Sequence, residues 1–366
     1  TISCVLGWIV AKISRKLKHK SLITVLISLV VIGAYFFVYF KAQGMIQDLL
    51  ANATVYGARI KGAAYPVYLF GSVGIGDVRA SAIVSAAVAV LFSLMWVLLS
   101  RSFLRIATST GKVARREYRE THSRHRSANI ALLCREFSHF TANPNYMLNC
   151  GLGTFLMPVC GIVVLWKGSE LFAVLDAIFA ETPDSVPLLL GVVFCGFASM
   201  NLMTAPSISL EGKSLWLLQS LPVEPWRIFR AKIEMQLLLT GLPLLLCIAC
   251  TAAVYPLHPM QLLVLLLFEG SFVLLMALVG LLLGVKMPTL TWTNEIVPIK
   301  QGGAVMLTLF GGFGYIVLLF VGFMLLPGWI LGFCRYMSCF VAANLFLSVL
   351  AYLWLRKKGV ARFSAL

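Results

Sequence analysis

A G-K-S tripeptide at Gly212–Ser214 has the residue types that close a phosphate-binding loop, in which backbone amides and a lysine hold the phosphates of a nucleotide. The motif also requires a glycine five residues before Gly212 and a preceding β-strand. Ser207 stands at that position, and an apolar segment of span length comes before it. A glycine-rich run at 71–76 likewise lacks the spacing of a dinucleotide-binding loop. We therefore predict that this chain does not itself hydrolyse ATP.

Cysteine and histidine pairs at the spacing of metal ligands each stand alone in the sequence. Cys247 and Cys250 form a C-x-x-C pattern inside an apolar segment, and no second ligand pair accompanies them. His122 and His125 lie in a strongly basic segment, where exposure to solvent is the simpler interpretation. The sequence therefore predicts neither a metal nor a cofactor bound by this chain.

Glu269 is an ionisable residue in the middle of an apolar segment, L-L-L-F-E-G-S-F. A charge at that membrane depth is costly, so such residues normally face the interior of a helix bundle or a water-filled cavity. Two interpretations stay open. Glu269 belongs to a substrate or proton path, as in an ion-coupled secondary transporter or an intramembrane enzyme, or it makes a structural hydrogen bond to a neighbouring helix.

The composition indicates which elements must position these residues. The chain has 366 residues, of which 60% are hydrophobic and 12% charged, and its apolar runs recur near the ~20 residues that cross a bilayer. This pattern is typical of a polytopic membrane protein. The net charge of +16 raises the alternative of nucleic-acid binding, but the basic residues cluster between apolar runs without interleaved aromatic side chains. We predict contact with membrane lipid and none with nucleic acid.

The apolar runs predict eight complete membrane spans and one partial span, all of them helical. Basic segments fall on one side of this topology, which marks the cytoplasm, and the acidic segment 167–187 falls on the other. The basic residues at 356–358 place the C-terminus in the cytoplasm. The partial span is Thr1–Ala11, and the complete spans are Leu22–Phe40, Ala80–Ser100, Tyr146–Trp166, Leu188–Ala205, Leu237–Tyr255, Gln261–Val285, Gly303–Leu326 and Phe333–Leu355.

Three regions follow from this layout. Residues 1–100 are interpreted as the C-terminal part of a first transmembrane half whose N-terminal part is missing, because the sequence starts inside an apolar run. Residues 101–129 are interpreted as a basic cytoplasmic linker. Residues 130–366 form a second half with six spans, and this half begins with an amphipathic helix at 130–142 that lies in the headgroup plane.

A second amphipathic element, at 209–222, follows the second span of that half. Ser209 is predicted to cap a helix over Leu210–Ser220, and Pro222 and Pro225 end this helix because proline has no backbone donor. Its apolar side chains are predicted to form one face, which would bind either a protein partner or the lipid headgroup layer. These side chains are Leu215, Trp216, Leu218 and Leu221.

Two motifs in this half resemble a known family. P-S-I-S-L-E-G-K-S-L-W-L-L-Q-S-L-P-V at 206–223 and W-T-N-E-I-V-P-I-K-Q at 292–301, with R-E-F-x-x-F in the first amphipathic helix, look like the membrane subunit of an ABC-2 type exporter. The closer resemblance is to bacterial ABC permeases in which two six-span halves are fused. The motifs cover residues 130–355, and residues 1–100 match only in layout.

The resemblance implies an all-α, polytopic transmembrane helical bundle with the ABC-2 permease fold, similar to type V exporters. It implies a transport permease in the bacterial plasma membrane and no enzyme, with ATP and Mg²⁺ bound by a dimeric cytoplasmic ABC ATPase. In that family the segment after the second span is a coupling helix, which lies in a groove of the ATPase. The residues carried over are Glu211, Gly212, Lys213, Leu215, Trp216, Leu218, Leu221 and Pro222 for ATPase coupling, Trp292, Thr293, Asn294, Glu295, Lys300 and Gln301 for the cytoplasmic loop, and Arg135, Glu136, Phe137 and Phe140 for the interfacial entry helix.

Overall fold

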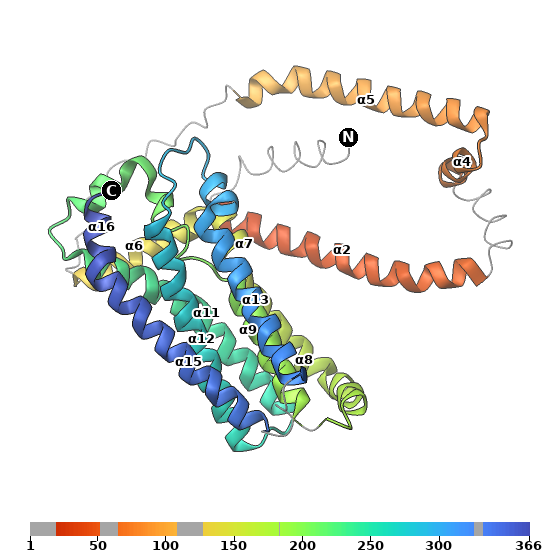
Figure 1. Ribbon diagram of the computed structural model, residues 1–366. Coiled ribbons are helices and arrows are strands. Elements are labelled where there is room, and N and C mark those ends of the chain that lie inside the picture. Colours follow the sequence, from red (N-terminus) through yellow and green to blue (C-terminus); the bar gives the residue numbers. More distant parts are fainter. Residues whose placement is uncertain (1–19, 52–64, 108–126, 183, 326–331) are drawn as a thin grey trace. The chain divides into compact units, whose positions relative to one another are not determined.

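The computed structural model describes residues 20–51, 65–107, 127–182, 184–325 and 332–366. These residues form helices and connecting segments, and no β-strand occurs among them (Figure 1). The chain divides into two compact units, Thr1–Ser123 and Arg124–Leu366, and each is described by itself. The predicted partial span Thr1–Ala11, most of the predicted linker at 101–129, and the histidines at 122 and 125 lie outside the described residues.

The first unit contains α2 (Lys20–Ala51), α4 (Tyr65–Gly74) and α5 (Val78–Ala107). Helices α2 and α5 each hold an apolar stretch long enough to cross a membrane, Ile23–Gly44 and Val78–Leu98. Nearly all of the described apolar side chains in these stretches are exposed. Because so much exposed apolar surface is unfavourable in water, both helices are suited to lipid.

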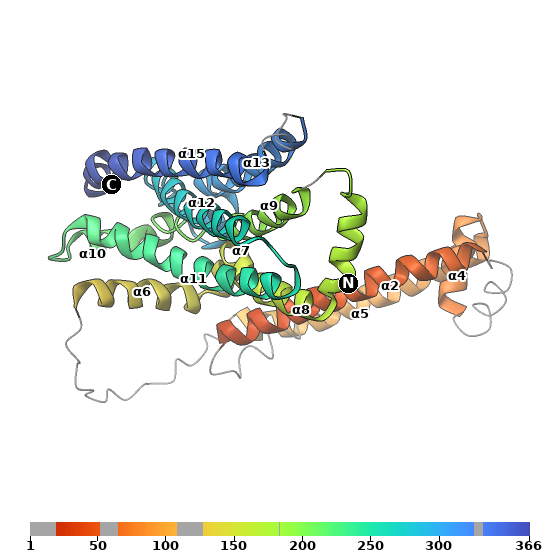
Figure 2. The ribbon, with the colours of Figure 1, turned by 90° about the horizontal axis from the view of Figure 1, so that it is seen from below.

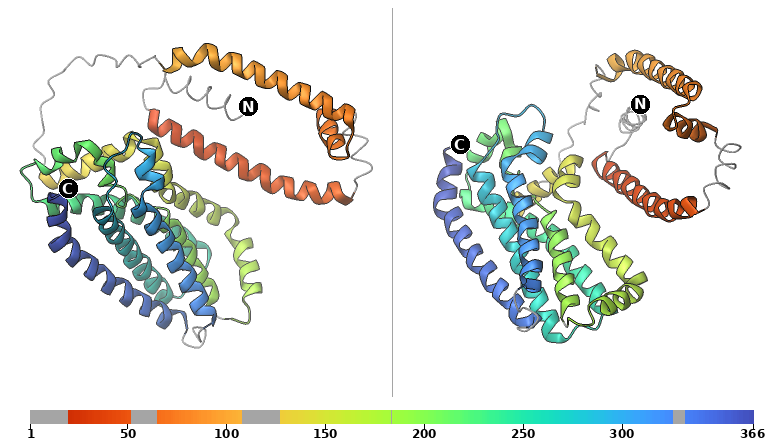
Figure 3. Two further views of the ribbon diagram at one scale, coloured as in Figure 1. Left: turned by 45° about the horizontal axis from the view of Figure 1, so that its top comes forward. Right: turned by 45° about the vertical axis from the view of Figure 1, so that its right-hand side comes forward.

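The second unit is a bundle of long helices that run alongside one another (Figures 1 and 3). They are α8 (Leu152–Ile178), α9 (Ser185–Ser199), α11 (Pro225–Val254), α12 (Pro259–Lys286), α13 (Gly303–Leu325) and α15 (Phe333–Trp354). Shorter elements gather at one end of the bundle, where Figure 2 shows α6, α10 and the C-terminus. These are α6 (Ala128–Ala142), α7 (Pro144–Cys150), η1 (Ser209–Ser214), α10 (Leu215–Gln219), η2 (Val297–Gln301), η3 (Leu355–Gly359) and α16 (Val360–Ser364).

Helix α12 forms the centre of the bundle and is the most buried of the span-length helices. It packs against α9, α11, α13 and α15. Two glycines on α12 allow a non-helical segment to approach its backbone. A Cβ atom at Gly280 would lie 2.6 Å from Thr204 Oγ1, and one at Gly284 would lie 2.5 Å from the carbonyl oxygen of Ala205. Small residues at this spacing permit such close contact.

Among the described residues, seven helices are long and apolar enough to span a membrane, and each overlaps one of the predicted complete spans. The remaining prediction, Leu188–Ala205, is wrong at its C-terminal end, because α9 has 15 residues and ends at Ser199. The span predicted at Tyr146–Trp166 is also displaced. Tyr146 belongs to the separate helix α7, and α8 continues to Ile178 through part of the predicted acidic external segment.

The chain that follows α9 is a buried, turn-rich segment rather than a helix. Backbone polar groups inside a membrane bundle must find partners in the protein, since lipid offers none. The backbone N–H of Leu202 donates to the carbonyl oxygen of Cys150 at 2.8 Å. The backbone N–H of Thr204 donates to Gln236 Oε1, also at 2.8 Å, and Gln236 Nε2 donates to the carbonyl oxygen of Asn201 at 3.0 Å. These bonds hold the segment that leads into η1.

Candidate functional site

Helix α6 carries a charged residue in the middle of its packing face. Its buried side chains are Leu132, Glu136 and Phe140, which recur at helical spacing, and Glu136 is only 3% exposed. Phe140 packs edge-to-face on Tyr146 of α7, with ring centroids 5.2 Å apart. A carboxylate in this position requires a positive or hydrogen-bonding partner, because removing it from water is costly.

Lys232 of α11 supplies the first partner. Its side chain is fully buried, and its Nζ lies 2.9 Å from Glu136 Oε2 and 3.1 Å from Glu211 Oε1. The same Nζ also donates to the carbonyl oxygen of Ser207 at 3.3 Å. An ammonium group has three N–H donors, so these contacts use all of them.

Arg135 of α6 closes the arrangement from the outer side. Its Nη2 lies 2.6 Å from Glu211 Oε2, and its Nη1 lies 3.1 Å from Glu211 Oε1 and 2.9 Å from Glu136 Oε1. A guanidinium that contacts both oxygens of one carboxylate fixes the orientation of that group. We call Arg135, Glu136, Glu211 and Lys232 the charge cluster. Its two acids and two bases balance, and they join α6, η1 and α11.

The electrostatics of the charge cluster favour its ionised form. Burial by itself would raise the pKa of Glu211, but the charges of Lys232 and Arg135 and their hydrogen bonds outweigh burial and lower the pKa to about 2. Burial would lower the pKa of Arg135, and the hydrogen bond and charge of Glu211 reverse this and raise it. Glu211 is therefore a carboxylate throughout the physiological pH range.

Glu211 belongs to a turn that also contacts the second sequence motif. Trp292 Nε1 donates to the carbonyl oxygen of Ser209 at 2.6 Å. Gly212 has φ +50° in this turn, and a Cβ atom there would lie 2.9 Å from the Trp292 ring. Glycine therefore meets two requirements at position 212, a left-handed backbone and direct contact with an indole ring.

The predicted helix over Leu210–Ser220 is wrong in its first half. The chain forms the 3₁₀-helix η1 over Ser209–Ser214, changes direction at Gly212, and becomes α-helical only over Leu215–Gln219. Ser209 does not cap a helix, because its Oγ accepts a hydrogen bond from the backbone N–H of Thr289 at 2.9 Å. The hydrogen bond between Ser209 and the loop after α12 takes the place of the predicted N-cap hydrogen bond.

Helix α10 divides its apolar side chains between two environments, so they do not form the single face expected from the sequence. Leu215 and Leu218 are 4% and 1% exposed and pack in the core of the unit. Trp216 and Leu217 of α10, and Leu221 two residues after the helix ends, are 63%, 51% and 37% exposed. We call these three residues the α10 tip. Lys213 and Pro222 are exposed on either side of it.

The loop motif at 292–301 lies beside η1. Thr293, Asn294 and Glu295 are exposed, and Asn294 Oδ1 accepts a hydrogen bond from the backbone N–H of Ile296 at 3.0 Å. The Glu295 carboxylate accepts one from the side chain of Asn143, which caps α7. Lys300 and Gln301 are exposed in the short helix η2, and Phe137 is half-buried on α6.

An open pocket of about 580 Å³ lies over this loop and is lined by His139, Leu210, Glu211, Lys213, Ser214, Trp292, Thr293 and Glu295.

One group of side chains at this site has the residue types of metal ligands. Possible ligand atoms of Glu136, His139 and Glu211 all lie within 4.8 Å of one another. Both carboxylates already contact Lys232 and Arg135, however, and two positive charges at such distances oppose the approach of a cation. These side chains therefore do not fit a metal ion while the charge cluster is intact.

Lys232 is the member of the charge cluster that lies outside the sequence motifs, and it follows two other basic residues, Arg227 and Arg230. A signal was present in the sequence. Lys232 is flanked at helical spacing by Ile228, Phe229 and Met235 of the buried face, so its position on α11 indicates a side chain that points inward. Arg135, Glu136 and Glu211 were selected in two separate motifs, and the structure brings them together.

Glu269 lies elsewhere in the bundle, on α12, and is 1% exposed. Its carboxylate oxygens lie 3.6 and 3.7 Å from Cys195 Sγ of α9. Among the described residues this thiol is its hydrogen-bond partner, and a thiol is a weak donor. A buried carboxyl group whose partner is a thiol has little hydrogen-bond support.

Comparison with protein-family models, with curated proteins and with solved structures finds no match for this chain. The arguments about function below therefore rest on sequence motifs, geometry and charge.

Proposed function

We propose that this chain is the membrane-spanning permease subunit of an ABC transporter, which exports a substrate with ATP hydrolysed by a separate, dimeric ATPase subunit. The observation that carries this proposal is the α10 tip. It is an exposed apolar surface built around Trp216, and tryptophan is one of the residues that dominate protein contacts. It lies within a few residues of Glu211, which anchors η1 to two other helices.

The charge cluster gives the α10 tip a mechanical connection to the bundle. A displacement of α10 moves Leu215 and Leu218 in the core, and it moves Glu211 against Arg135 of α6 and Lys232 of α11. Because a buried ion pair is costly to separate, α6 and α11 would follow this movement rather than release the carboxylate. In this proposal ATP binding by the partner moves the α10 tip, and α11 transmits the movement into the membrane.

The same proposal places the chain in the bacterial plasma membrane, with the basic loops and the C-terminus in the cytoplasm. The charge cluster, the α10 tip and the exposed basic residues Arg356, Lys357 and Lys358 lie at one end of the bundle. An excess of basic residues at one membrane face is the usual mark of the cytoplasmic side.

Affinity purification from mild detergent tests the partner. The double variant Trp216→Ala/Leu217→Ala removes exposed side chains without opening the core. Leu165 and Trp166 on α8, which are 54% and 80% exposed, provide a matched control pair. We expect an ATPase to co-purify with the wild-type chain and with the Leu165→Ala/Trp166→Ala control, but not with the α10 variant. Equal recovery with all three chains would remove the α10 tip as the docking surface.

A second candidate function rests on Glu269. An ion-coupled secondary transporter, or an intramembrane enzyme, would use a buried ionisable group with weak support, as Glu269 is. A proton-coupled carrier moves protons without ATP, so proteoliposomes that contain only this chain would acidify in a pH gradient, and Glu269→Gln would abolish the flux. Under the ABC proposal the chain alone carries no such flux, and a pH-sensitive dye inside the vesicles distinguishes the two.

A further inference from the structure

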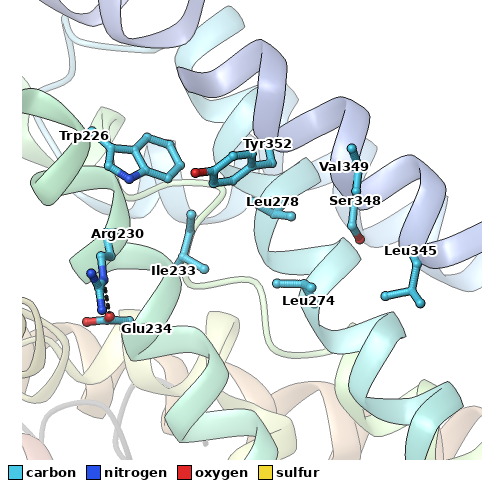
Figure 4. A pocket seen from close by; sticks show the side chains of 10 residues that line it. All are labelled: Trp226, Arg230, Ile233, Glu234, Leu274, Leu278, Leu345, Ser348, Val349 and Tyr352. Carbon is cyan, nitrogen blue, oxygen red and sulfur yellow. Dashed lines mark hydrogen bonds and ion pairs between the residues drawn. The ribbon is translucent and has the colours of Figure 1, made fainter. Parts of the chain in front are cut away.

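A groove between α11 and α15 has a lining that changes from polar to apolar along its length (Figure 4). Its volume is about 430 Å³, within the range of about 300–1,000 Å³ that is usual for ligand pockets. Helix α12 forms its floor through Leu274 and Leu278. The side walls are Trp226, Arg230, Ile233 and Glu234 of α11 and Leu345, Ser348, Val349 and Tyr352 of α15.

The polar end of the groove is lined by the charged residues Arg230 and Glu234, and Arg356 lies next to it. Arg230 Nε donates to Glu234 at 2.6 Å, and its two terminal amino groups make no hydrogen bond with the described residues. Tyr352 belongs to the opposite wall, and its hydroxyl accepts a hydrogen bond at 3.2 Å from Nη1 of Arg356, which does not itself line the groove. Trp226 and Tyr352 meet edge-to-face, with ring centroids 5.0 Å apart. The Arg230–Glu234 pair is neutral, so the positive charge at this end comes from the neighbouring Arg356, and the free guanidinium N–H donors of Arg230 match the oxygens of a phosphate.

Ser348 is an independent indication that the groove holds a ligand. Its side chain is 3% exposed, lines the groove, and its Oγ has no hydrogen-bond partner. Ser338 on the same helix donates to the carbonyl oxygen of Cys334 at 2.7 Å, and Ser271 on α12 donates to that of Phe268 at 2.8 Å. Ser185 and Ser199 of α9 also lack a partner, but neither of them lines this groove. A buried hydroxyl without a partner is costly, so Ser348 points to a polar atom supplied by an occupant.

The position of the groove in the bundle indicates the kind of occupant. Arg230 is the sixth residue of α11, which starts at Pro225, so it lies about 8 Å from the end of that helix. Tyr352 is near the C-terminal end of α15, and Leu345 and Val349 lie deeper on the same helix and are about half exposed. Tryptophan, tyrosine and arginine at this depth are typical of the headgroup layer of a membrane. The apolar half of the groove then faces the acyl-chain layer.

We propose that this groove binds one anionic phospholipid. Its phosphate contacts Arg230 and the hydroxyl of Tyr352, its ester region accepts a hydrogen bond from Ser348, and one acyl chain lies on Leu274 and Leu278. This site is independent of the transport function proposed above, because it requires only that the second unit is embedded in a membrane.

Native mass spectrometry of the full chain in detergent tests the site, with dioleoyl phosphatidylglycerol, dioleoyl phosphatidylcholine and inorganic phosphate as separate probes. We expect one phosphatidylglycerol per chain, weaker binding of phosphatidylcholine, and no competition from phosphate alone. Arg230→Gln removes charged hydrogen bonds and should weaken phosphatidylglycerol binding about tenfold or more. Ser348→Leu should weaken it by filling the groove. Should that variant fail to fold, Val349→Trp fills the same space from a side chain that is 55% exposed.

Two matched controls make the result specific. Arg335→Gln removes an exposed arginine near the opposite end of α15, and Leu350→Phe enlarges an exposed side chain of α15 that does not line the groove. Both should bind phosphatidylglycerol as the wild type does. Equal binding of the two lipids, unchanged binding by Arg230→Gln, or full competition by phosphate would overturn the proposal. A dimer of the wild-type chain that Ser348→Leu dissociates would assign the groove to a second copy instead.

Discussion

Lys232 and Glu136 are separated by 96 residues in the chain, yet Lys232 Nζ lies 2.9 Å from Glu136 Oε2 and both side chains are buried. This pair fixes α11 against α6, and Glu211 adds η1 to the same contact. The bundle end that carries the α10 tip is thus held together by charge as well as by apolar packing. Such a contact stabilises the fold only while it is complete, because the loss of one partner leaves an unpaired charge in the interior.

Lys232→Met is expected to be the most destabilising single substitution in the charge cluster. Breaking a buried ion pair from one side costs about 3–5 kcal/mol, since Glu136 and Glu211 remain without their shared cation. Thermal unfolding in detergent, followed by fluorescence, measures the loss. Adding Glu136→Gln should restore part of the lost stability, and a double variant that is as unstable as the sum of the two single variants would contradict this coupling.

The stability of the second unit should fall between pH 4.5 and pH 2 through Glu211. Its pKa is lowered from 4.5 to about 2 in the folded state, so above pH 4.5 the carboxylate is ionised whether or not the chain is folded, and its contribution is complete. As the pH falls below 4.5, the unfolded chain takes up the proton first and the contribution is lost.

Glu211→Gln should therefore show a smaller loss of stability in this pH window than the wild type. Glu170→Gln is the control, because Glu170 forms an exposed pair with Lys167. Unfolding temperatures measured at several pH values for the three chains check the prediction, and identical profiles for wild type and Glu211→Gln would contradict it.

Gly212→Ala should destabilise η1 and shift the fluorescence of Trp292. A non-glycine residue at φ +50° is strained, and its Cβ would lie 2.9 Å from the indole ring. We expect a cost of about 1–3 kcal/mol. Gly196→Ala on α9 is a suitable control, since no atom lies within 4 Å of its added Cβ. Wild-type stability in Gly212→Ala would show that the turn adjusts without cost.

Leu218→Ala and Trp216→Ala, two residues apart on α10, should have opposite effects on stability and partner binding. Leu218 is buried in the core, and its truncation should cost about 2–5 kcal/mol of unfolding free energy. Trp216 is exposed, and its truncation should change stability by no more than about 0.5 kcal/mol while it weakens recovery of the ATPase. Comparable destabilisation by the two variants would place Trp216 in the core as well.

Hydropathy was sufficient for most of the fold, because a bilayer sets the length of any helix that crosses it. The helices α12, α13 and α15 begin or end within a few residues of their predicted bounds. The error at α9 has a different origin. Leu188–Ala205 is apolar enough for a span, and contacts with α7, with Gln236 and with the glycines of α12 favour a buried loop after Ser199.

The candidate site could be predicted in its parts but not in its assembly. The motifs selected Glu211, Trp292 and Arg135 as residue types, but a periodic pattern along one helix says nothing about which distant charge pairs with which. The periodicity of α11 therefore indicates that Lys232 is buried, but it does not identify Glu136 and Glu211 as its partners. The sequence also does not predict which side of α10 is buried, because Leu218 and Trp216 are both apolar. In the structure Leu218 packs in the same core cluster as Phe229 and Phe363, and this packing leaves Trp216 exposed.

The C-terminal segment has a practical consequence for experiments on this protein. Gln219 Nε2 of α10 donates to the carbonyl oxygen of Phe363 at 2.7 Å, so α16 lies directly beside α10. If the α10 tip docks a partner as proposed, a purification tag or fluorescent protein fused next to α16 would occupy the space in which that partner has to fit. Such a fusion would give a false negative in a pull-down, and a label inserted elsewhere in the chain avoids it.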